Sequence, residues 1–407
     1  MAYRPGWVDH LIGWHVYPLG FVGASTRLES QEVSHRLAHL EAWLDHAVAL
    51  GCSSLALGPV FSSASHGYDT LDYFTIDPRL GDDDDFDHLL QAAHARGLSV
   101  LLNHVSRRNR IVQDAQSAGP DSDAGRMVRW CAGRLDVFEG HSDLVALNHD
   151  NPAVREHVTR IMNYWCGRGV DGWRLDAAYS VNPEFWAAVL PPVREKHPDV
   201  WIFGEVIHGD YASIVRASGM DSVTQYELWK GIWSSIESRN FFELDHALGR
   251  HNEFSDVFTP VTFVGNHDVT RIASRVGQDG AVLATAILAT IGGIPLIYYG
   301  DELAYRGVKE ERFGGDDDIR PVFPASPADL SNLGADTLRA HQSLLGLRRR
   351  HPWLVDARTE SLDLTNERYV YRTGVPGVEP LIVELDVRDG CSVLIREAGQ
   401  VVWSSGA

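Results

Sequence analysis

The feature that most restricts the fold is a repeated alternation of short apolar runs with longer amphipathic segments. Eight runs have the length and composition of β-strands: Gly13–Tyr17, Ser54–Leu57, Leu98–Val105, Gly172–Leu175, Val200–Gly204, Ser222–Gln225, Val261–Val264 and Pro295–Tyr299. Strands that alternate with helices form parallel sheets, and eight of them close into a barrel. The sequence therefore predicts an α/β fold built on a (β/α)8 TIM barrel.

Three of the intervening helices have clear sequence signatures. They are predicted at Glu32–Leu50, Phe86–Arg96 and Pro152–Cys166, the last between an Asn151 cap and Gly167. The acidic run Asp82–Asp85 stands just before the second helix, where negative charge is favourable. We therefore expect this run to be a solvated helix start.

Two segments interrupt the alternation. Residues 106–147 follow the third strand, are polar and lack a helical period, which predicts an inserted loop subdomain over the barrel mouth. From residue 352 onward, short strand-like runs are separated by glycine and proline. The expected domains are a barrel of residues 1–105 and 148–351, the insertion 106–147, and a small antiparallel β domain 352–407.

Charge and composition limit the partners and the compartment. Lys and Arg total 36 against 55 Asp and Glu, a net charge of -19 that repels nucleic acid and anionic lipid. No apolar run is long enough to span a bilayer, and residues 1–20 do not resemble a signal peptide. Four separated cysteines form no CxxC pair, which is typical of free thiols in a reducing compartment. We expect a cytoplasmic protein without nucleic-acid or membrane partners, whose oligomeric state the sequence leaves open.

Carboxylates follow three of the predicted strands. Asp176 ends the fourth strand two residues after Arg174, Glu205 ends the fifth, and Asp268 follows the seventh. The carboxyl ends of barrel strands meet at one mouth, where active sites lie. An arginine keeps a neighbouring carboxylate ionised, and burial suits a carboxyl group to acid catalysis. A pair of such groups is what retaining glycoside hydrolysis requires.

The order of these motifs resembles the alpha-amylase family, glycoside hydrolase family 13, over nearly the whole chain, and its intracellular alpha-glucosidase and cyclomaltodextrinase types in particular. The motifs are His66-Gly-Tyr-Asp69 with Asp72-Tyr73, Leu144–Asn148, Gly172–Asp176, Gly204-Glu205, Phe263–Asp268 and Gly293–Glu302. The resemblance implies that Asp176 is the nucleophile, Glu205 the acid/base, and Asp268 a catalytic group that holds the distorted sugar. It also implies substrate binding by Tyr68, Asp69, His104, Arg174, Asn266, His267 and Arg320.

The sequence departs from the family pattern in two places. The family places an aspartate before the Asn-His pair of the third strand, and no aspartate precedes Asn103-His104. Either Asn103 replaces that aspartate, or the strand has lost about four residues and His104 is drawn up to the sugar; both predict weakened catalysis. The Lys-His pair that often follows the nucleophile is also missing at Ala177–Ser180. This argues against a calcium-dependent endo-amylase, so no cofactor or metal is predicted, although calcium near Asn103 stays open.

Three functions remain open at this point. The leading prediction is a retaining hydrolase of α-glucosidic bonds in short or cyclic maltooligosaccharides, with a small oligosaccharide as its partner. Transglycosylation or isomerisation through the same covalent intermediate is the second. The third is a weakened family member that binds sugar, which the altered third strand suggests.

Overall fold

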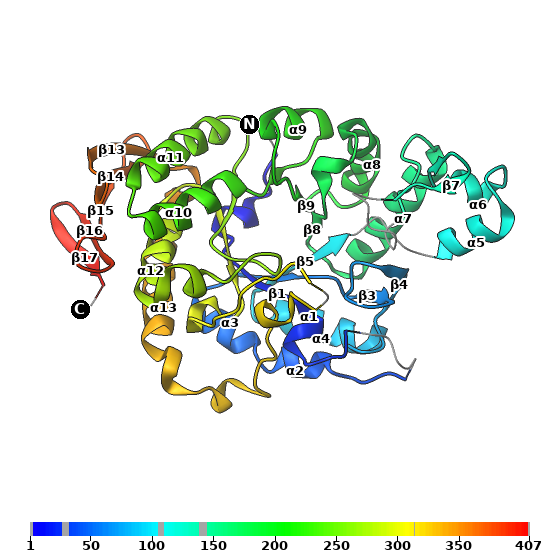
Figure 1. Cartoon of the computed structure of the whole chain (residues 1–407), viewed down its shortest axis with the longest axis horizontal. Helices are drawn as coiled ribbons and strands as arrows, with labels where there is room; N and C mark the ends of the chain where they lie inside the picture. The colour runs from blue at the N-terminus through cyan, green and yellow to red at the C-terminus, as the bar shows by residue number, and fades with distance from the viewer. Residues whose placement is uncertain (1–2, 27–31, 105–109, 138–144, 313, 406–407) are drawn as a thin grey trace.

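The computed structural model describes residues 3–26, 32–104, 110–137, 145–312 and 314–405 (Figure 1). Its centre is a parallel sheet of eight strands. These strands are β1 (Gly13–Val16), β2 (Ser54–Leu57), β5 (Ser99–His104), β8 (Gly172–Leu175), β9 (Trp201–Gly204), β10 (Ser222–Val223), β11 (Val261–Phe263) and β12 (Ile294–Tyr298). A bridge between Thr224 and Val261 joins β10 to β11 and closes the barrel. The predicted (β/α)8 fold and all eight strands are confirmed.

Helices surround this barrel. The long ones are α4 (Asp83–Ala95), α7 (Pro152–Arg168), α8 (Pro183–Lys196), α10 (Tyr226–Ser238), α11 (Phe241–Ser255), α12 (Ile272–Thr290) and α13 (Ala335–Arg350). Shorter ones are α1 (Pro18–Phe21), α2 (Leu37–Glu41), α3 (Leu44–Leu50) and α9 (Tyr211–Ser218). In the described residues, none is both long and apolar enough to cross a membrane.

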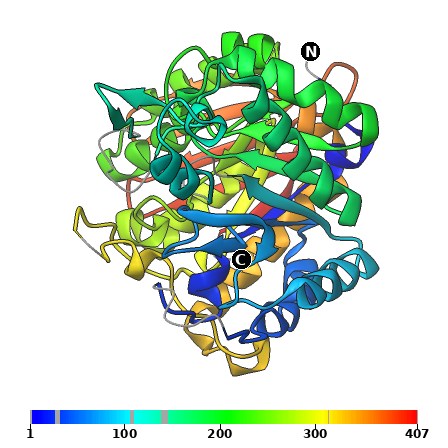
Figure 2. The ribbon, with the colours of Figure 1, turned by 90° about the vertical axis from the view of Figure 1, so that its right-hand side faces the viewer.

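Additions to the barrel lie at opposite ends of the long axis (Figure 1). The insertion carries α5 (Arg110–Ala118), α6 (Asp123–Arg126) and the short β6–β7 pair (Trp130–Cys131 and Arg134–Leu135), and in Figure 2 it projects toward the viewer. At the other end, β13 (Arg358–Leu364), β14 (Arg368–Gly374), β15 (Leu381–Asp386), β16 (Ser392–Glu397) and β17 (Gln400–Ser404) form an antiparallel sheet in sequence order. A hairpin after β2, β3 (Phe61–Ser63) and β4 (Thr70–Ile76), borders the mouth.

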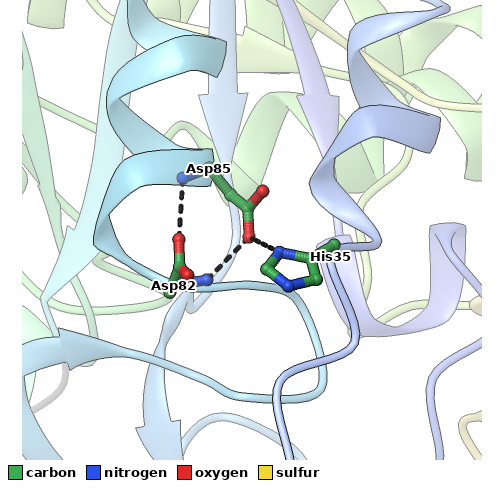
Figure 3. Close-up of side chains that lie close together, drawn as sticks. All are labelled: His35, Asp82 and Asp85. Carbon is green, nitrogen blue, oxygen red and sulfur yellow. Dashed lines mark hydrogen bonds and ion pairs between the residues drawn. The ribbon is translucent and has the colours of Figure 1, made fainter.

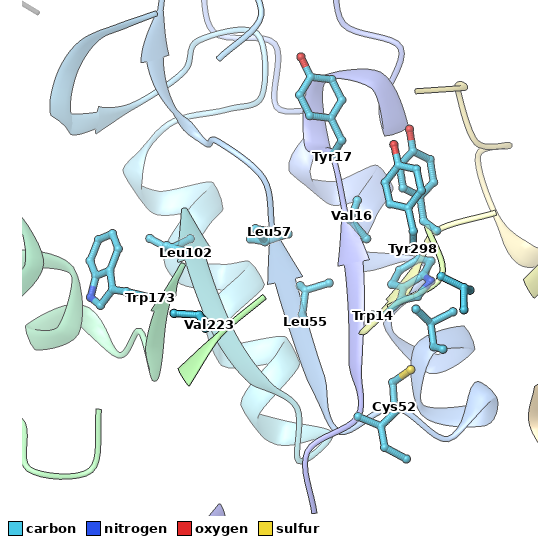
Figure 4. Packing of buried hydrophobic residues seen from close by; sticks show 14 of the residues in the cluster. Trp14, Val16, Tyr17, Cys52, Leu55, Leu57, Leu102, Trp173, Val223 and Tyr298 are labelled. Carbon is cyan, nitrogen blue, oxygen red and sulfur yellow. The ribbon is translucent and has the colours of Figure 1, made fainter. Parts of the chain in front are cut away.

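Along each barrel strand, successive side chains alternate between two apolar layers. Outward side chains such as Trp14, Leu55, Leu57 and Trp173 pack against the helices (Figure 4). Inward side chains form a separate cluster that includes Ala56, Leu101, Trp201, Phe203, Phe263 and Leu296. Because successive strand residues face opposite sides, an inward polar residue stands among this inner cluster. Arg174 is such a residue, between outward-facing Trp173 and Leu175.

Several predicted elements differ in detail. The segment Glu32–Leu50 forms two short helices, and α7 runs on to Arg168 because Gly169, not Gly167, takes the left-handed conformation. The insertion is not purely loop, since α5 buries Val112 and Ala115 on one face. The sequence pattern does not indicate the strand β13, because it lies at the sheet edge and has mostly exposed, polar residues.

The acidic run Asp82–Asp85 forms the cap and first turn of α4, the helix start that the sequence predicts (Figure 3). Asp82 accepts the backbone N–H of Asp85 at 3.0 Å, and Asp85 accepts the backbone N–H of Asp82 at 2.9 Å. His35 contacts the same Asp85 oxygen at 2.7 Å, and this hydrogen bond raises the pKa of the exposed imidazole. The reciprocal pair satisfies amide groups that the first turn leaves without helical partners.

The two-layer packing predicts a large cost for truncating an outward strand residue. Leu55→Ala in β2 removes a fully buried side chain, and we expect it to lower the free energy of unfolding by about 2–5 kcal/mol. Leu333→Ala is the matched control, because Leu333 is 90% exposed, and its effect should stay within about 0.5 kcal/mol. Chemical denaturation of both variants measures the difference, and equal losses would contradict the assigned packing.

Candidate active site

Three carboxylates line one pocket at the carboxyl ends of the strands. Asp176 directly follows β8, Glu205 directly follows β9, and Asp268 lies in the loop after β11. The pocket has a volume of about 360 Å³, opens to solvent, and is also lined by Tyr68 and Tyr226. The structure thus brings together the three residues that the sequence placed at separate strand ends.

Arg174 holds two of these carboxylates. Its Nη1 lies 2.8 Å from Asp176 Oδ1, and its Nη2 lies 2.7 Å from Glu205 Oε1. All three side chains are at least nine-tenths buried. Charge-assisted hydrogen bonds of this length are strong and directional, so the guanidinium sets both the spacing and the orientation of the pair.

Glu205 is poised to carry a proton. Burial raises its pKa, and the carboxylates of Asp176 and Asp268 raise it further, while Arg174 opposes them. Its Oε2 accepts the backbone N–H of Ala177 at 3.0 Å. A buried carboxyl with a raised pKa is the usual arrangement of a general acid.

The chain turns sharply just after β8, and this turn allows the hydrogen bond between Ala177 and Glu205. Ala177 has a φ of 44°, a left-handed conformation that costs free energy in a residue with a Cβ atom. This turn presents the amide of Ala177 to Glu205. Gly204, just before Glu205, has no room for a side chain, since a Cβ atom would lie 2.5 Å from Met220 Sδ.

Asp268 is held ionised by its neighbours. Burial alone would raise its pKa, but His267, Arg320 and Arg174 together hold it well below its usual range. Arg320 lies 3.0 Å from Asp268 Oδ1, and His267 Nε2 lies 3.0 Å from Oδ2. The long loop after β12 therefore reaches the site through Arg320, as the sequence suggested.

Aromatic rings support this side of the pocket. His267 is fully buried, and the rings of Tyr17 and Tyr68 are nearly parallel to its ring, with centroids 6.0 and 5.4 Å away. The Tyr68 hydroxyl is hydrogen-bonded to His267 Nε2. Burial raises the pKa of Tyr68 well above its usual value, so the hydroxyl keeps its proton.

Asp69 has a different setting from the other predicted binding residues. It is buried, and its two oxygens accept the Ser65 backbone N–H at 3.0 Å and the Ser65 hydroxyl at 2.7 Å. The side chain therefore braces the loop that carries Tyr68.

The third strand forms a regular part of the barrel sheet. The strand β5 has six residues, and it pairs with β2 from Ser99 and with β8 through His104 without a shift in register. Asn103 is buried and donates to the Tyr68 hydroxyl at 3.3 Å. This geometry favours the interpretation in which Asn103 stands where the family has aspartate. The side chain of His104 lies outside the described residues, so its predicted role stays a prediction.

Sequence reasoning missed several residues of the pocket. Tyr226, from the start of α10, donates to Glu205 Oε1 at 3.1 Å, and Asn266 donates to the Tyr226 hydroxyl at 2.8 Å. Tyr179, Ile207 and Lys309 lie on the pocket wall. Tyr226 and Tyr179 each lie within a few residues of the end of a predicted strand, and this position is the one sequence feature that could have placed them at the pocket. Lys309 comes from a long loop whose course the sequence does not indicate.

The described residues offer little for a metal ion. Within them, His35, Asp82 and Asp85 are the sole group of three His, Cys, Asp or Glu side chains close enough to share an ion, and they form the cap of α4. Residues 105–109, close to Asn103 in the sequence, lie outside the described part of the chain, so calcium near Asn103 stays an untested alternative. The prediction of no cofactor remains untested.

Comparison of the sequence with known proteins gives a clear family match. A model described as the alpha-amylase catalytic domain matches residues 37–135 and 135–358. Alpha-amylase 3 from Dictyoglomus thermophilum is 31% identical over 66% of this chain and 60% of its own. A Bacillus cyclomaltodextrinase is 27% identical over 85% and 67%, and the intracellular maltogenic amylase of Bacillus subtilis 28% identical over 74% and 57%. The chain therefore spans roughly 57–67% of the length of these relatives.

Solved structures agree on the fold. A cyclic α-maltosyl-(1→6)-maltose hydrolase from Arthrobacter globiformis superposes with a TM-score of 0.83 at 24% identity, over 99% of both chains. A debranching enzyme from Nostoc punctiforme gives 0.80 at 24% identity, over 95% of this chain and 88% of that one. The catalytic-domain match covers more than half of the sequence and contains all three pocket carboxylates, so the chain belongs to the alpha-amylase family.

Proposed function

We propose that this protein is a retaining glycoside hydrolase that cleaves α-glucosidic bonds in short or cyclic maltooligosaccharides. The observation that carries the proposal is the shared guanidinium of Arg174, which holds Asp176 and Glu205 side by side. Retaining enzymes keep their two carboxyl groups closer together than inverting enzymes do. Two carboxylates on one guanidinium meet that requirement.

The residues divide the reaction between them. Asp176 attacks the anomeric carbon while Glu205 gives its proton to the departing glycosidic oxygen, which leaves a sugar ester on Asp176. Glu205 then takes a proton from water, whose oxygen displaces Asp176 from the sugar. Asp268, ionised beside His267 and Arg320, accepts hydrogen bonds from sugar hydroxyl groups and stabilises the positively charged transition state.

The substrate class rests on the relatives and on the pocket. Proteins similar to this chain are named cyclomaltodextrinase and maltogenic amylase, and one carries the word intracellular in its name. That name supports the expectation of a cytoplasmic enzyme. Tyr68 lies at the pocket wall, where its ring offers an apolar face to a sugar.

Transfer to a second sugar is the alternative outcome of the same intermediate. Ile207 is 38% exposed on the pocket wall near Glu205, and Tyr179 lies on the same wall. This apolar surface can hold an acceptor sugar in place of water. Against the weakened sugar-binding alternative stand the three carboxylates, Asp176, Glu205 and Asp268, which line one pocket.

The first prediction concerns the two paired carboxylates. Asp176→Asn and Glu205→Gln should each lower kcat on maltotriose by about a thousandfold or more, because each removes a reacting group. Glu360→Gln, an exposed carboxylate of β13, is the matched control and should leave kcat unchanged. Initial rates of glucose or maltose release measure the effect. Unaltered turnover in Asp176→Asn or Glu205→Gln would refute the enzyme assignment at this pocket.

The second prediction concerns pH. Activity requires Glu205 in its protonated form, and burial together with Asp176 and Asp268 raises the pKa of this residue. We therefore expect kcat/KM to fall with rising pH, with the midpoint of the falling limb above the usual glutamate pKa of 4.5. Asp268 has a lowered pKa and stays ionised across the same range. The profile of kcat/KM against pH tests this, and a falling limb centred at or below about 4.5 would contradict the assignment of Glu205 as the acid.

The third prediction separates hydrolysis from transfer. Incubation with maltose should release glucose as the main product, because the open pocket admits water to the ester on Asp176. Thin-layer chromatography resolves the products at several maltose concentrations. Trisaccharides or rearranged disaccharides as the main products would replace hydrolysis with transfer while keeping the same catalytic groups.

A further inference from the structure

A hydrogen-bond chain connects the acid/base residue with the loop that carries Asp268. Asn266 Oδ1 accepts the backbone N–H of Asp268 at 2.9 Å, and Asn266 Nδ2 lies 2.8 Å from the Tyr226 hydroxyl. That hydroxyl lies 3.1 Å from Glu205 Oε1. The chain therefore links the ends of β9 and β11 through one half-buried phenol.

The direction of this chain is determined by its donors. Because Asn266 uses its oxygen for the amide of Asp268, its Nδ2 faces Tyr226 and can only donate. The Tyr226 oxygen accepts that hydrogen bond, so its own proton points to Glu205. Burial raises the pKa of Tyr226 well above its usual value, so this proton is present throughout the working pH range.

The two oxygens of Glu205 consequently differ. Oε1 receives two donors, Arg174 at 2.7 Å and Tyr226 at 3.1 Å. Oε2 receives the backbone N–H of Ala177 at 3.0 Å, the sole donor to it among the described groups. A carboxylate oxygen has two in-plane acceptor sites, so Oε1 is filled and Oε2 keeps one free for a proton.

We propose that Tyr226 is a positioning residue which, together with Arg174, occupies Oε1 of Glu205 and so reserves Oε2 for the catalytic proton. The proposal rests on the proposed function and deepens it. The proton leaves Oε2 for the glycosidic oxygen as the bond from that oxygen to the anomeric carbon breaks and the bond to Asp176 forms. A proton from water returns to Oε2 when the water oxygen bonds to the sugar and the ester breaks. Tyr226 keeps its own proton in both steps.

The test measures Glu205 directly. Carboxyl ¹³C signals of labelled glutamate are titrated in the wild type and in Tyr226→Phe, and Glu205 is assigned by its loss in Glu205→Gln. Loss of a donor to the ionised form should raise the pKa of Glu205 by about one unit. The falling limb of kcat/KM should move up with it, and kcat should drop about tenfold with KM within about twofold.

Tyr371→Phe is the matched control. Tyr371 is a buried tyrosine whose hydroxyl is hydrogen-bonded to Thr290 at 2.7 Å, between the C-terminal sheet and α12. It should lose stability without moving the pKa of Glu205 or the pH profile. A purely structural role of Tyr226 predicts the same result for both variants.

A second variant covers the case in which Tyr226→Phe does not fold. Replacing Tyr226 by 3-fluorotyrosine keeps its shape and strengthens its donor, so the pKa of Glu205 should fall. An unchanged pKa of Glu205 in a folded variant overturns the positioning role, even if the wild type hydrolyses maltotriose. A shifted pKa in a protein that cleaves no α-glucoside upholds the positioning role and rejects the proposed function.

Discussion

The site depends on a single buried cation shared between two strands. Arg174 projects inward from β8 and contacts Asp176 from its own strand and Glu205 from β9. Replacing Arg174 by a neutral residue would leave Asp176 and Glu205 as buried carboxylates without a compensating charge, and this is strongly destabilising. The same contact that satisfies these carboxylates also sets their spacing, so the stability of the mouth and its chemistry cannot be separated.

The barrel makes this arrangement possible by separating its two faces. Outward residues of each strand pack under the helices, while inward residues form the inner cluster on which the polar groups stand. Parallel strands end at one rim, so Asp176 and Glu205 follow adjacent strands in the same direction. The low polarity below them raises the pKa of Glu205, whereas cationic neighbours keep Asp268 ionised. One pocket thus shifts the pKa values of two carboxyl groups in opposite directions.

Loops complete the pocket from several directions. Tyr68 comes from the β3–β4 hairpin, Tyr226 from the start of α10, and Arg320 from the long segment after β12. Each contacts a residue at a strand end: Tyr68 meets His267, Tyr226 meets Glu205, and Arg320 meets Asp268. These hydrogen bonds and ion pairs hold the loops against the strand ends, and fixed polar groups of this kind are what a preorganised site requires.

The sequence by itself determined the barrel, its eight strands and the three carboxylates, because strand period and strand-end position are local patterns that a parallel sheet brings to one rim. It did not determine the edge strand β13, whose polar residues carry no period, or the register of β5, which depends on pairing with β2 and β8. Only the tertiary structure decided that Asn103 meets Tyr68, that Asp69 faces its own loop, and that Tyr226 reaches Glu205. These contacts join residues far apart in the chain, and their distances follow from the closure of the barrel rather than from any neighbour in sequence.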